Sequence, residues 1–507
     1  MRALAALPQD VQLPSVNAKT SAAARWLSSP WTLLLAVAVL RVPAFVYGVL
    51  DIDESDFALI ARRIAQGAMP YVDIADIKPP LAFLAYLPSG IFESVPLWPM
   101  QAVAVLWVAA TSLVLRAAAR RMTGSEVAGW CAAWLALVAG FCELPKVSTE
   151  ILMNLPSAAA LWFWVRAEQE EGKWFDLAAG ACIGLASLFR HQGAVLLLSL
   201  GAVMLVRGRV GRLLSMAAGF ALPWGLAGGF FAGTGHFAEF WDWVVRRNFR
   251  YTSLHQGWLG RFAEGVLPSL AATLAAWIVA VRASAGALRR GPSAIEAGLI
   301  ASLAASCAAI CLGGRFYSHY FLQFIPLLAL LGAGEAAAMI RKWSRTAAAL
   351  CLLPALVLGG VTIGRGMENG YPCQEPRARL LAGWLEENTR PDERLFIWGH
   401  FSPIYLMSHR LPGTRYLTTS VHVGNFDPAH VPPGFDLSPF RSDADVALTL
   451  SDLERNRVPL FIDTAPAGIH SWNRVPLSTV PALARYLAEH YRPVAEVAGA
   501  RIYRRSP

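Results

Sequence analysis

The sequence predicts a polytopic α-helical membrane protein of about 11 transmembrane helices, followed by a soluble α/β domain at its C-terminal end. Three observations predict this fold class. Hydrophobic residues make up 55% of the chain and charged residues only 16%, whereas soluble proteins carry about 25% charged residues. Apolar runs of about 20 residues, enough for a helix to cross a bilayer, recur through the first 364 positions. Beyond residue 364 the apolar runs shorten, and polar and turn-forming residues become frequent.

The apolar runs divide the chain into segments. They cover residues 31–50, 98–118, 126–142, 150–166, 175–189, 193–206, 212–232, 262–282, 293–313, 319–340 and 346–364. We therefore expect an N-terminal tail at 1–30, a transmembrane domain at 31–364 whose first outer loop spans 51–97, and an extracytoplasmic domain at 365–507.

The distribution of positive charge predicts the orientation. Lys and Arg residues gather between alternate runs, and because such loops resist translocation they are expected in the cytoplasm. These residues are Arg116, Arg120 and Arg121; Arg166 and Lys173; Arg207, Arg209 and Arg212; Arg282, Arg289 and Arg290; and Arg341, Lys342 and Arg345. The N-terminus is then cytoplasmic, and the C-terminal domain lies outside the cytoplasm. The net charge of +9 is scattered over short loops and forms no single basic face, which argues against nucleic acid as a partner.

Helix and strand patterns alternate in the C-terminal region. Helical patterns cover 376–389, 443–456 and 481–490, and strand patterns cover 394–398, 459–463, 494–497 and 501–503. This alternation predicts a small three-layer α/β domain. The domain contains no Gly-rich phosphate loop and no nucleophile elbow.

The first outer loop begins with an amphipathic pattern. Apolar side chains recur at helical spacing at Phe57, Ile60, Ala61, Ile64 and Ala65, while Asp56, Arg62, Arg63 and Gln66 occupy the other side. The pattern predicts a helix that ends at Gly67 and lies along the membrane surface with its polar side solvated. Asp53 and Glu54 open this helix. They either cap it and favour its positive end, or act as reactive carboxylates at the headgroup level.

Lys78 precedes two prolines, which extend its backbone and allow a helix to start at Pro80. The apolar segment 81–92 is too short to cross a bilayer, so it either dips into the outer leaflet or lies against the bundle. The Lys78 ammonium either binds a lipid phosphate or marks the membrane boundary as a snorkelling side chain.

The motifs Asp53-Glu54, Pro70-Tyr71 and Lys78-Pro79-Pro80-Leu81, in this order after a first transmembrane run, resemble a known signature. It is that of C-type membrane glycosyltransferases of family 39, which are related to protein O-mannosyltransferases and lipid A aminoarabinose transferases. The resemblance implies inverting transfer of a sugar from a polyprenyl-phosphate carrier to a hydroxyl acceptor, which is a lipid, polysaccharide or protein. It implies Asp53 as general base and Lys78 as the phosphate ligand. Ile77 replaces an acidic residue of some relatives, so a contact made by that acid is in doubt.

Other residues of the expected outer side are candidates for the same site. We predict Asp53 and Glu150 as catalytic, and Glu54, Lys78, Tyr71, Lys146, Arg190, His191, Arg315, His319 and Tyr320 as substrate-binding. The resemblance suggests Glu150 through an acidic position common in the family, although a carboxylate at a helix start has the same pattern. Arg190 and His191 interrupt two short apolar runs, where they either contact phosphate or form a re-entrant turn. Arg315 and His319 sit at the mouth of an apolar run, where Tyr320 also fits an aromatic belt.

Two other functions stay open. A transporter or flippase also has many spans, but it usually carries charge near the bilayer midplane and often has two similar halves, for which the sequence gives no sign. A membrane-anchored binding protein without catalysis is the third interpretation. No His or Cys spacing indicates a structural metal site, and a divalent cation at the outer site is left open.

Overall fold

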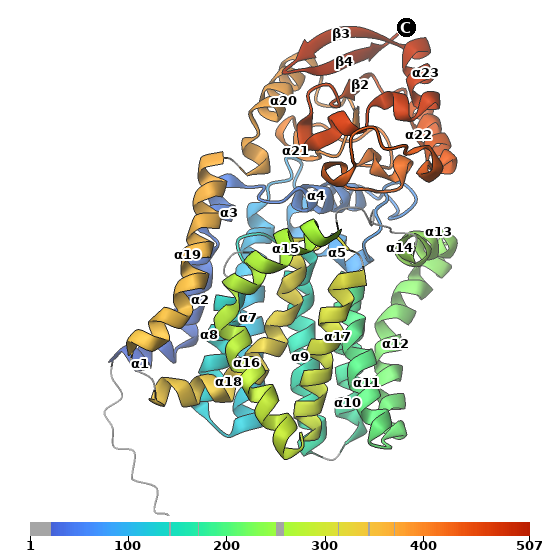
Figure 1. Cartoon of the computed structure of the whole chain (residues 1–507). Helices are drawn as coiled ribbons and strands as arrows, with labels where there is room; N and C mark the ends of the chain where they lie inside the picture. The colour runs from blue at the N-terminus through green and yellow to red at the C-terminus, as the bar shows by residue number, and fades with distance from the viewer. Residues whose placement is uncertain are drawn as a thin grey trace, which may run out of the picture.

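The computed structural model describes residues 22–140, 143–170, 172–249, 258–312, 314–342, 345–369 and 371–507. A bundle of long helices carries a smaller domain with a sheet at one end (Figure 1). The first helix, α1 (Ala22–Leu27), belongs to the expected N-terminal tail, whose residues 1–21 lie outside the described part.

Helices occupy the positions of all eleven apolar runs. They are α2 (Pro30–Leu40) with α3 (Val42–Tyr47), α7 (Trp98–Thr123), α8 (Glu126–Gly140), α9 (Thr149–Gln169), α10 (Lys173–Phe189), α11 (Val195–Val206), α12 (Val210–Gly233), α15 (Trp258–Ala272) with α16 (Leu274–Arg290), α17 (Ala294–Leu312), α18 (Ile325–Lys342) and α19 (Arg345–Asn369).

The predicted count of 11 membrane crossings is not confirmed. Among the described residues, four helices are long and apolar enough to cross a membrane, namely α7, α12, α17 and the segment Ser318–Ile340. The pair α15 and α16 adds a fifth if it is one span, and it bends by 81° at its break. Helices such as α2 and α8 are apolar but shorter, because a hydrophobic run in sequence need not fold as one straight helix.

Basic side chains gather at the end of the bundle opposite the C-terminal domain. Arg209 and Arg212 pair with Glu168 there, at 2.6 and 2.5 Å, and Arg212 also pairs with Asp176 at 2.8 Å. These contacts bring together the ends of α9, α10 and α12, which the charge pattern assigned to one side. The bundle therefore has one strongly basic end, and the C-terminal domain covers the other (Figure 1).

The first outer loop folds as three helices. They are α4 (Ile52–Ala65), α5 (Pro80–Leu84), which starts at the second proline, and α6 (Leu87–Gly90). The helix cap of α4 is Asp51, which forms a capping box with Glu54, so the expected capping role of Asp53 is corrected.

The environment of α4 also corrects the expectation of a solvated surface helix. This helix lies between the bundle and the C-terminal domain (Figure 1), and its residues from Glu54 to Ala61 are buried. Its polar side contacts the C-terminal domain, where Ser55 Oγ is 2.6 Å from Ser402 Oγ. Periodicity alone identifies a polar face and cannot tell whether water or another polar surface covers it.

The C-terminal domain is built on a four-stranded sheet of order β1-β2-β4-β3. Strands β1 (Leu395–Trp398) and β2 (Leu460–Asp463) are parallel, while β4 (Ala500–Arg505) is antiparallel to β2 and to β3 (Tyr491–Val497). Its main helices are α20 (Pro376–Asn388), α21 (Pro403–Met407), α22 (Asp443–Arg455) and α23 (Pro481–His490).

Alternate strand residues face opposite layers of this domain. Leu395 and Ile397 share a core with α20 and α21, while Phe396 and Trp398 share one with α22 and α23. The first core continues into α4 and the loop that follows it. The sheet thus has helices on both faces, and one face connects the domain to the first outer loop.

Candidate active site

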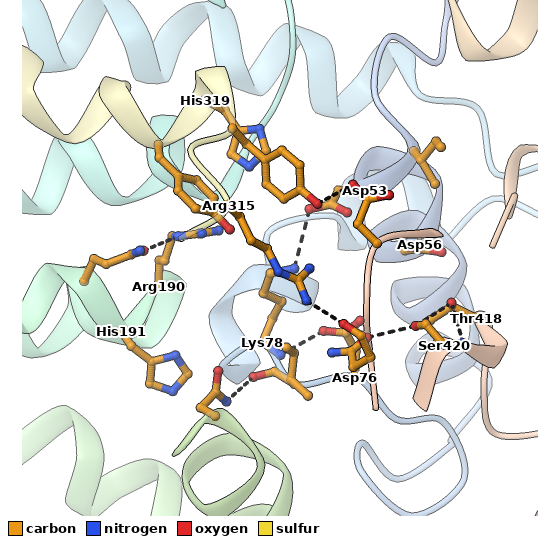
Figure 2. A pocket seen from close by; sticks show the side chains of 18 of the residues that line it. Asp53, Asp56, Asp76, Lys78, Arg190, His191, Arg315, His319, Thr418 and Ser420 are labelled. Carbon is orange, nitrogen blue, oxygen red and sulfur yellow. Dashed lines mark hydrogen bonds and ion pairs between the residues drawn. The ribbon is translucent and has the colours of Figure 1, made fainter. Parts of the chain in front are cut away.

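A cavity of about 720 Å³ lies where the C-terminal domain meets the end of the bundle. Its lining comes from α4, the loop before α5, the start of α11, the end of α17, the segment before α18, and loops of the C-terminal domain. Figure 2 shows Arg190 and His191 on one side of this cavity and Asp53, Asp56, Thr418 and Ser420 on the other.

Asp53 and Lys78 face each other in the cavity. The Lys78 Nζ atom is 3.5 Å from Asp53 Oδ2, and both side chains are partly exposed, at 21% for the lysine and 33% for the aspartate. Asp53 stands in the first turn of α4, two positions after the capping residue Asp51. This position fixes the carboxylate at the edge of the bundle, opposite the lysine.

The backbone around Lys78 is held at several points. Its N–H donates to Asp76 Oδ1 at 2.8 Å, and its carbonyl accepts the Tyr71 hydroxyl at 2.9 Å. One residue earlier, the Ile77 carbonyl accepts the Asn248 amide at 2.9 Å. With Pro79 in an extended conformation after it, Lys78 has little freedom to turn away from the cavity.

The charge of Asp53 depends on its cationic neighbours. Burial raises the pKa of this carboxyl, but Lys78, His319, His400 and Arg190 lower it by more, to about 2. Asp53 is therefore a carboxylate at every ordinary pH. In this unliganded arrangement it is also a weak base, because a good general base has a pKa near the working pH.

Arg190 is held on the opposite side by groups behind the cavity wall. Its Nε atom is 2.9 Å from Glu150 Oε1, its Nη1 donates to Thr149 Oγ1 at 3.1 Å, and its guanidinium lies 4.5 Å from the centre of the Tyr320 ring. Arg190 is the C-terminal cap residue of α10, and the short helix η1 (His191–Ala194) follows it directly. This geometry places a buried guanidinium at the cavity surface.

The other predicted residues that reach the cavity are Lys146, His191, Arg315, His319 and Tyr320. His191 Nε2 is 2.7 Å from the Val244 carbonyl, which fixes its ring. Lys146 pairs with Glu143 at 3.0 Å and with Asp51 at 4.0 Å, and these carboxylates raise its pKa although burial lowers it. Eight of the eleven predicted site residues therefore line one cavity.

Three predicted residues do not line it, namely Glu54, Tyr71 and Glu150. Glu54 is buried and accepts the backbone N–H groups of Leu50 and Val147, each at 2.7 Å, so its expected role as a substrate contact is corrected to a structural one. Tyr71 is buried behind Lys78. Glu150, predicted as catalytic, lies behind Arg190 with its side chain 1% exposed and 4.0 Å from His319. Tyr71 contacts Lys78 and Glu150 contacts Arg190, and both of these cations reach the cavity.

Sequence reasoning missed the contributions of Asp51, Asp56, Asp76, His400, Thr418, Ser420, Asn425, Asp427 and His470. Asp76 is two positions before Lys78 and places a carboxylate in the region where Ile77 had suggested that one was absent. Burial raises the pKa of Asp76, and the nearby Asp56 and Asp53 raise it further against the effect of Lys78. Asp76 could have been found from the sequence, because an acidic residue two positions before Lys78 lies close to it in any backbone conformation. No sequence pattern connects the residues of the C-terminal domain to a loop so far away in the chain.

The carboxylates and imidazoles of the cavity do not converge on a metal position. Within the described ranges, no group of three or more His, Cys, Asp or Glu side chains has an arrangement that could hold a metal ion.

Part of the helix bundle matches a known protein family. Residues 77–227 match the family model described as dolichyl-phosphate-mannose-protein mannosyltransferase. No curated protein matches the sequence significantly. The resemblance that the motifs predicted is thus confirmed by a match that covers the lysine and several bundle helices.

The structure is similar to ArnT from Cupriavidus metallidurans, both bound to undecaprenyl phosphate and in the apo state. Sequence identity is 14%, and the likeness covers 95% of this chain and 98% of ArnT, with TM-scores of 0.61 and 0.60. At this identity the comparison establishes the common fold, and it includes the C-terminal domain because nearly the whole length is covered.

Proposed function

We propose that this protein is an inverting glycosyltransferase that moves a sugar from a polyprenyl-phosphate carrier to a hydroxyl acceptor. The observation that carries the proposal is the pairing of Asp53 with Lys78 at 3.5 Å in a cavity that also contains Arg190 and Arg315. A carboxylate can take the proton from a hydroxyl group. Cations beside it can bind a phosphate leaving group and offset its negative charge.

In the proposed reaction, the acceptor oxygen attacks the anomeric carbon from the face opposite the phosphate. The bond between this carbon and the phosphate oxygen breaks, and its electron pair leaves with the polyprenyl phosphate. Asp53 takes the hydroxyl proton, while Lys78 and Arg190 offset the negative charge that grows on the phosphate. For Asp53 and Lys78 to act on opposite sides of the reacting carbon, the Lys78 ammonium must move from its contact with Asp53 to the phosphate when the donor binds.

Donor binding is expected to strengthen Asp53 as a base. Without donor, Lys78 is the main cation that lowers the pKa of this carboxyl against the effect of burial. A phosphate held by Lys78 would share that positive charge, so the pKa of Asp53 would rise. The carboxylate would thus gain basicity when a donor is in place.

The edge of the cavity suits an apolar carrier. Val244, Val245 and Phe249 line it from the segment after α12, and Ile310 and Leu312 line it from the end of α17. Phe249 and Leu312 are 88% and 89% exposed to their surroundings. Exposed apolar side chains that lead into a cationic cavity fit a lipid tail attached to a phosphate.

We also infer the placement in the membrane. The basic end of the bundle would face the cytoplasm of a bacterium, and the cavity and the C-terminal domain would lie on the periplasmic side of the inner membrane. The Ser318–Ile340, α7, α12 and α17 segments supply the apolar length that this placement requires. The acceptor would then be a lipid, a polysaccharide or a protein outside the cytoplasm.

The test uses purified protein in liposomes with radiolabelled polyprenyl-phosphate sugars and a membrane extract as the source of acceptor. Asp53→Asn and Lys78→Ala are compared with the exposed controls Asp392→Asn and Lys173→Ala. We expect label transfer to fall at least about 100-fold in the two site variants and to stay unchanged in the controls. Equal transfer by all variants would reject the site, and label that crosses the bilayer without transfer would favour a transporter.

A further inference from the structure

The two sides of the cavity differ in charge. Arg190 and His191 lie on one side, and the carboxylates of Asp53 and Asp56 lie on the other, beside Thr418 and Ser420 (Figure 2). We name the C-terminal-domain part of the second side the roof, and define it by His400, Thr418, Ser420, Asn425, Asp427 and His470. The roof carries hydroxyl, amide, carboxylate and imidazole groups, whereas the guanidinium and ammonium groups of the lining come from the bundle and its loops.

Asp56 has an unsatisfied buried acceptor. Its side chain is 5% exposed, and its Oδ2 atom is 3.3 Å from His400 Nε2. Its Oδ1 atom is buried and accepts no hydrogen bond from any group in the described part of the chain. A buried carboxylate oxygen without a donor is unfavourable, so its persistence beside a cavity indicates a donor that arrives with a ligand.

His400 is held in place from the C-terminal domain. It follows β1 after Gly399, whose N–H donates to Thr419 Oγ1 at 2.9 Å. A Cβ atom at Gly399 would lie 2.3 Å from Thr464 Oγ1, so only glycine fits this approach. The His400 carbonyl contacts His470 Nδ1 at 3.0 Å, and His470 has a positive φ of 51°. These backbone contacts therefore hold the His400 imidazole in position beside Asp56.

We propose that Asp56, His400 and the roof form a subsite that binds the hydroxyl groups of a saccharide. A sugar hydroxyl would donate to Asp56 Oδ1, and the adjacent imidazole and the Thr418 and Ser420 hydroxyls would contact neighbouring oxygens. This inference rests on the proposed glycosyl transfer and extends it by giving the C-terminal domain a direct part in recognition.

The chemistry of this side favours a sugar over the phosphate. Asp56 and Asp427 would repel a phosphate on this side, whereas Arg190 attracts it on the opposite side of the cavity. Hydroxyl groups both donate and accept, which suits a surface of carboxylates, amides and imidazoles. Phe426 also lines this part and adds apolar surface to it.

The sugar can come from either of two substrates, which binding experiments separate. Purified full-length protein is titrated with undecaprenyl phosphate and with undecaprenyl phosphate that carries mannose, glucose, galactose or aminoarabinose. The variants are Asp56→Asn and His400→Gln. Asp56→Asn keeps an acceptor oxygen at only one of the two carboxylate positions, so the oxygen faces either His400 or the ligand hydroxyl, and the NH2 group, which only donates, faces the other.

If the subsite holds the donor sugar, we expect the variants to bind the preferred sugar-bearing lipid about tenfold or more weakly and the sugar-free lipid unchanged. If it holds the acceptor sugar, both lipids bind as before, while KM for a polysaccharide or glycolipid acceptor rises by a similar factor. Either result supports the subsite, because each assigns the loss to a sugar. Unchanged binding and unchanged KM, or an equal loss for lipid with and without sugar, would overturn it.

A matched control separates recognition from folding. Ser55→Ala removes the Ser55–Ser402 contact between the same helix and the same domain, and neither serine lines the cavity. The melting temperature of Ser55→Ala measures how much stability the loss of one contact at this interface costs. The affinity of Ser55→Ala for the sugar-bearing lipid should stay unchanged. Absence of any transfer or lipid binding by the wild-type protein would instead reject the proposed function, so the two failures are distinguishable.

Discussion

At the scale of single residues, several cations of the candidate site face the cavity while neighbouring groups hold them in position. Lys78 faces the cavity while Tyr71 and Asp76 hold its backbone. Arg190 faces it while Glu150 holds the guanidinium from behind. Because Tyr71 and Glu150 are buried behind these cations, their removal should affect the proposed reaction through position and charge.

The Asp53–Lys78 pair leads to a prediction about pH. Lys78→Gln removes the main cation that lowers the pKa of Asp53 and leaves burial, which raises it. The wild-type kcat/KM should therefore show no acid limb from Asp53 above about pH 3, since a carboxyl with a pKa of about 2 stays ionised there. In the variant, residual kcat/KM should fall with decreasing pH well above that value.

The measurement is initial-rate transfer between about pH 4 and 8 with a fixed polyprenyl-phosphate sugar. Lys173→Gln, at an exposed position in the first turn of α10, serves as the control for loss of a positive charge. A variant profile parallel to the wild-type profile would show that Lys78 does not control the charge of the base.

At the scale of elements, the helices that present the site are set by close contacts. Helix α10 carries Arg190 at its end and crosses α12 at two glycines. A Cβ atom at Gly180 would lie 1.9 Å from the Met216 carbonyl oxygen, and one at Gly219 would lie 2.0 Å from that of Leu177. Small residues at a crossing let two helix backbones approach, which is common in membrane bundles.

Gly180→Ala should therefore separate α10 from α12 and destabilise the protein by about 1–3 kcal/mol. Because α10 ends at Arg190, we also expect weaker phosphate-lipid binding. Gly225→Ala, on the exposed side of α12 with no atom near its added Cβ, should be neutral. Thermal unfolding in detergent and lipid titration measure the two effects. Equal melting temperatures for the two variants would contradict the tight crossing.

At the scale of the whole molecule, the C-terminal domain closes the cavity through contacts with several bundle segments. Arg247, from the segment after α12, forms two hydrogen bonds with Asp445 at 2.8 and 2.9 Å. The Tyr317 hydroxyl donates to Asp427 at 2.6 Å, and the Ala75 N–H donates to the Arg415 carbonyl at 2.9 Å. The domain is thus attached on more than one side of the site.

The Arg247–Asp445 pair predicts how this attachment responds to acid. Burial raises the pKa of Asp445, but its bonds to Arg247, Ser442 and Tyr416 lower it below its ordinary value. The pair therefore stabilises the fold above the unfolded-state pKa, and this stability is lost as pH falls through the lower folded-state pKa. Arg247→Gln raises that pKa, so the loss on acidification should begin at a higher pH.

Thermal unfolding between about pH 3 and 7 measures the shift. At pH 7 we expect Arg247→Gln to lose about 1–3 kcal/mol, because it leaves a buried carboxylate without its cation. The double variant Arg247→Gln and Asp445→Asn should recover part of this loss. If the double variant is less stable than Arg247→Gln alone, the unpaired charge is not the cause.

Most helices and strands were predictable because they depend on local patterns. The apolar runs gave helix positions, and the segments 376–389 and 481–490 matched α20 and α23 closely. Strands β3 and β4 proved longer than predicted, since their polar outward residues hide part of the alternation. The number of membrane crossings could not be predicted, because an apolar run in the sequence does not indicate where its helix breaks or bends.

The sequence by itself predicted the membrane class, the fold resemblance and the Asp53–Lys78 pair of the candidate site. Asp53 and Lys78 lie in one loop, where short range and two prolines restrict their geometry. Only the tertiary structure brought His400, Ser420 and Asp427 to the same cavity and turned Glu54 and Glu150 into supporting residues. The physical reason is that burial and long-range contacts depend on how the C-terminal domain packs on α4, and periodicity within one segment carries no information about that partner.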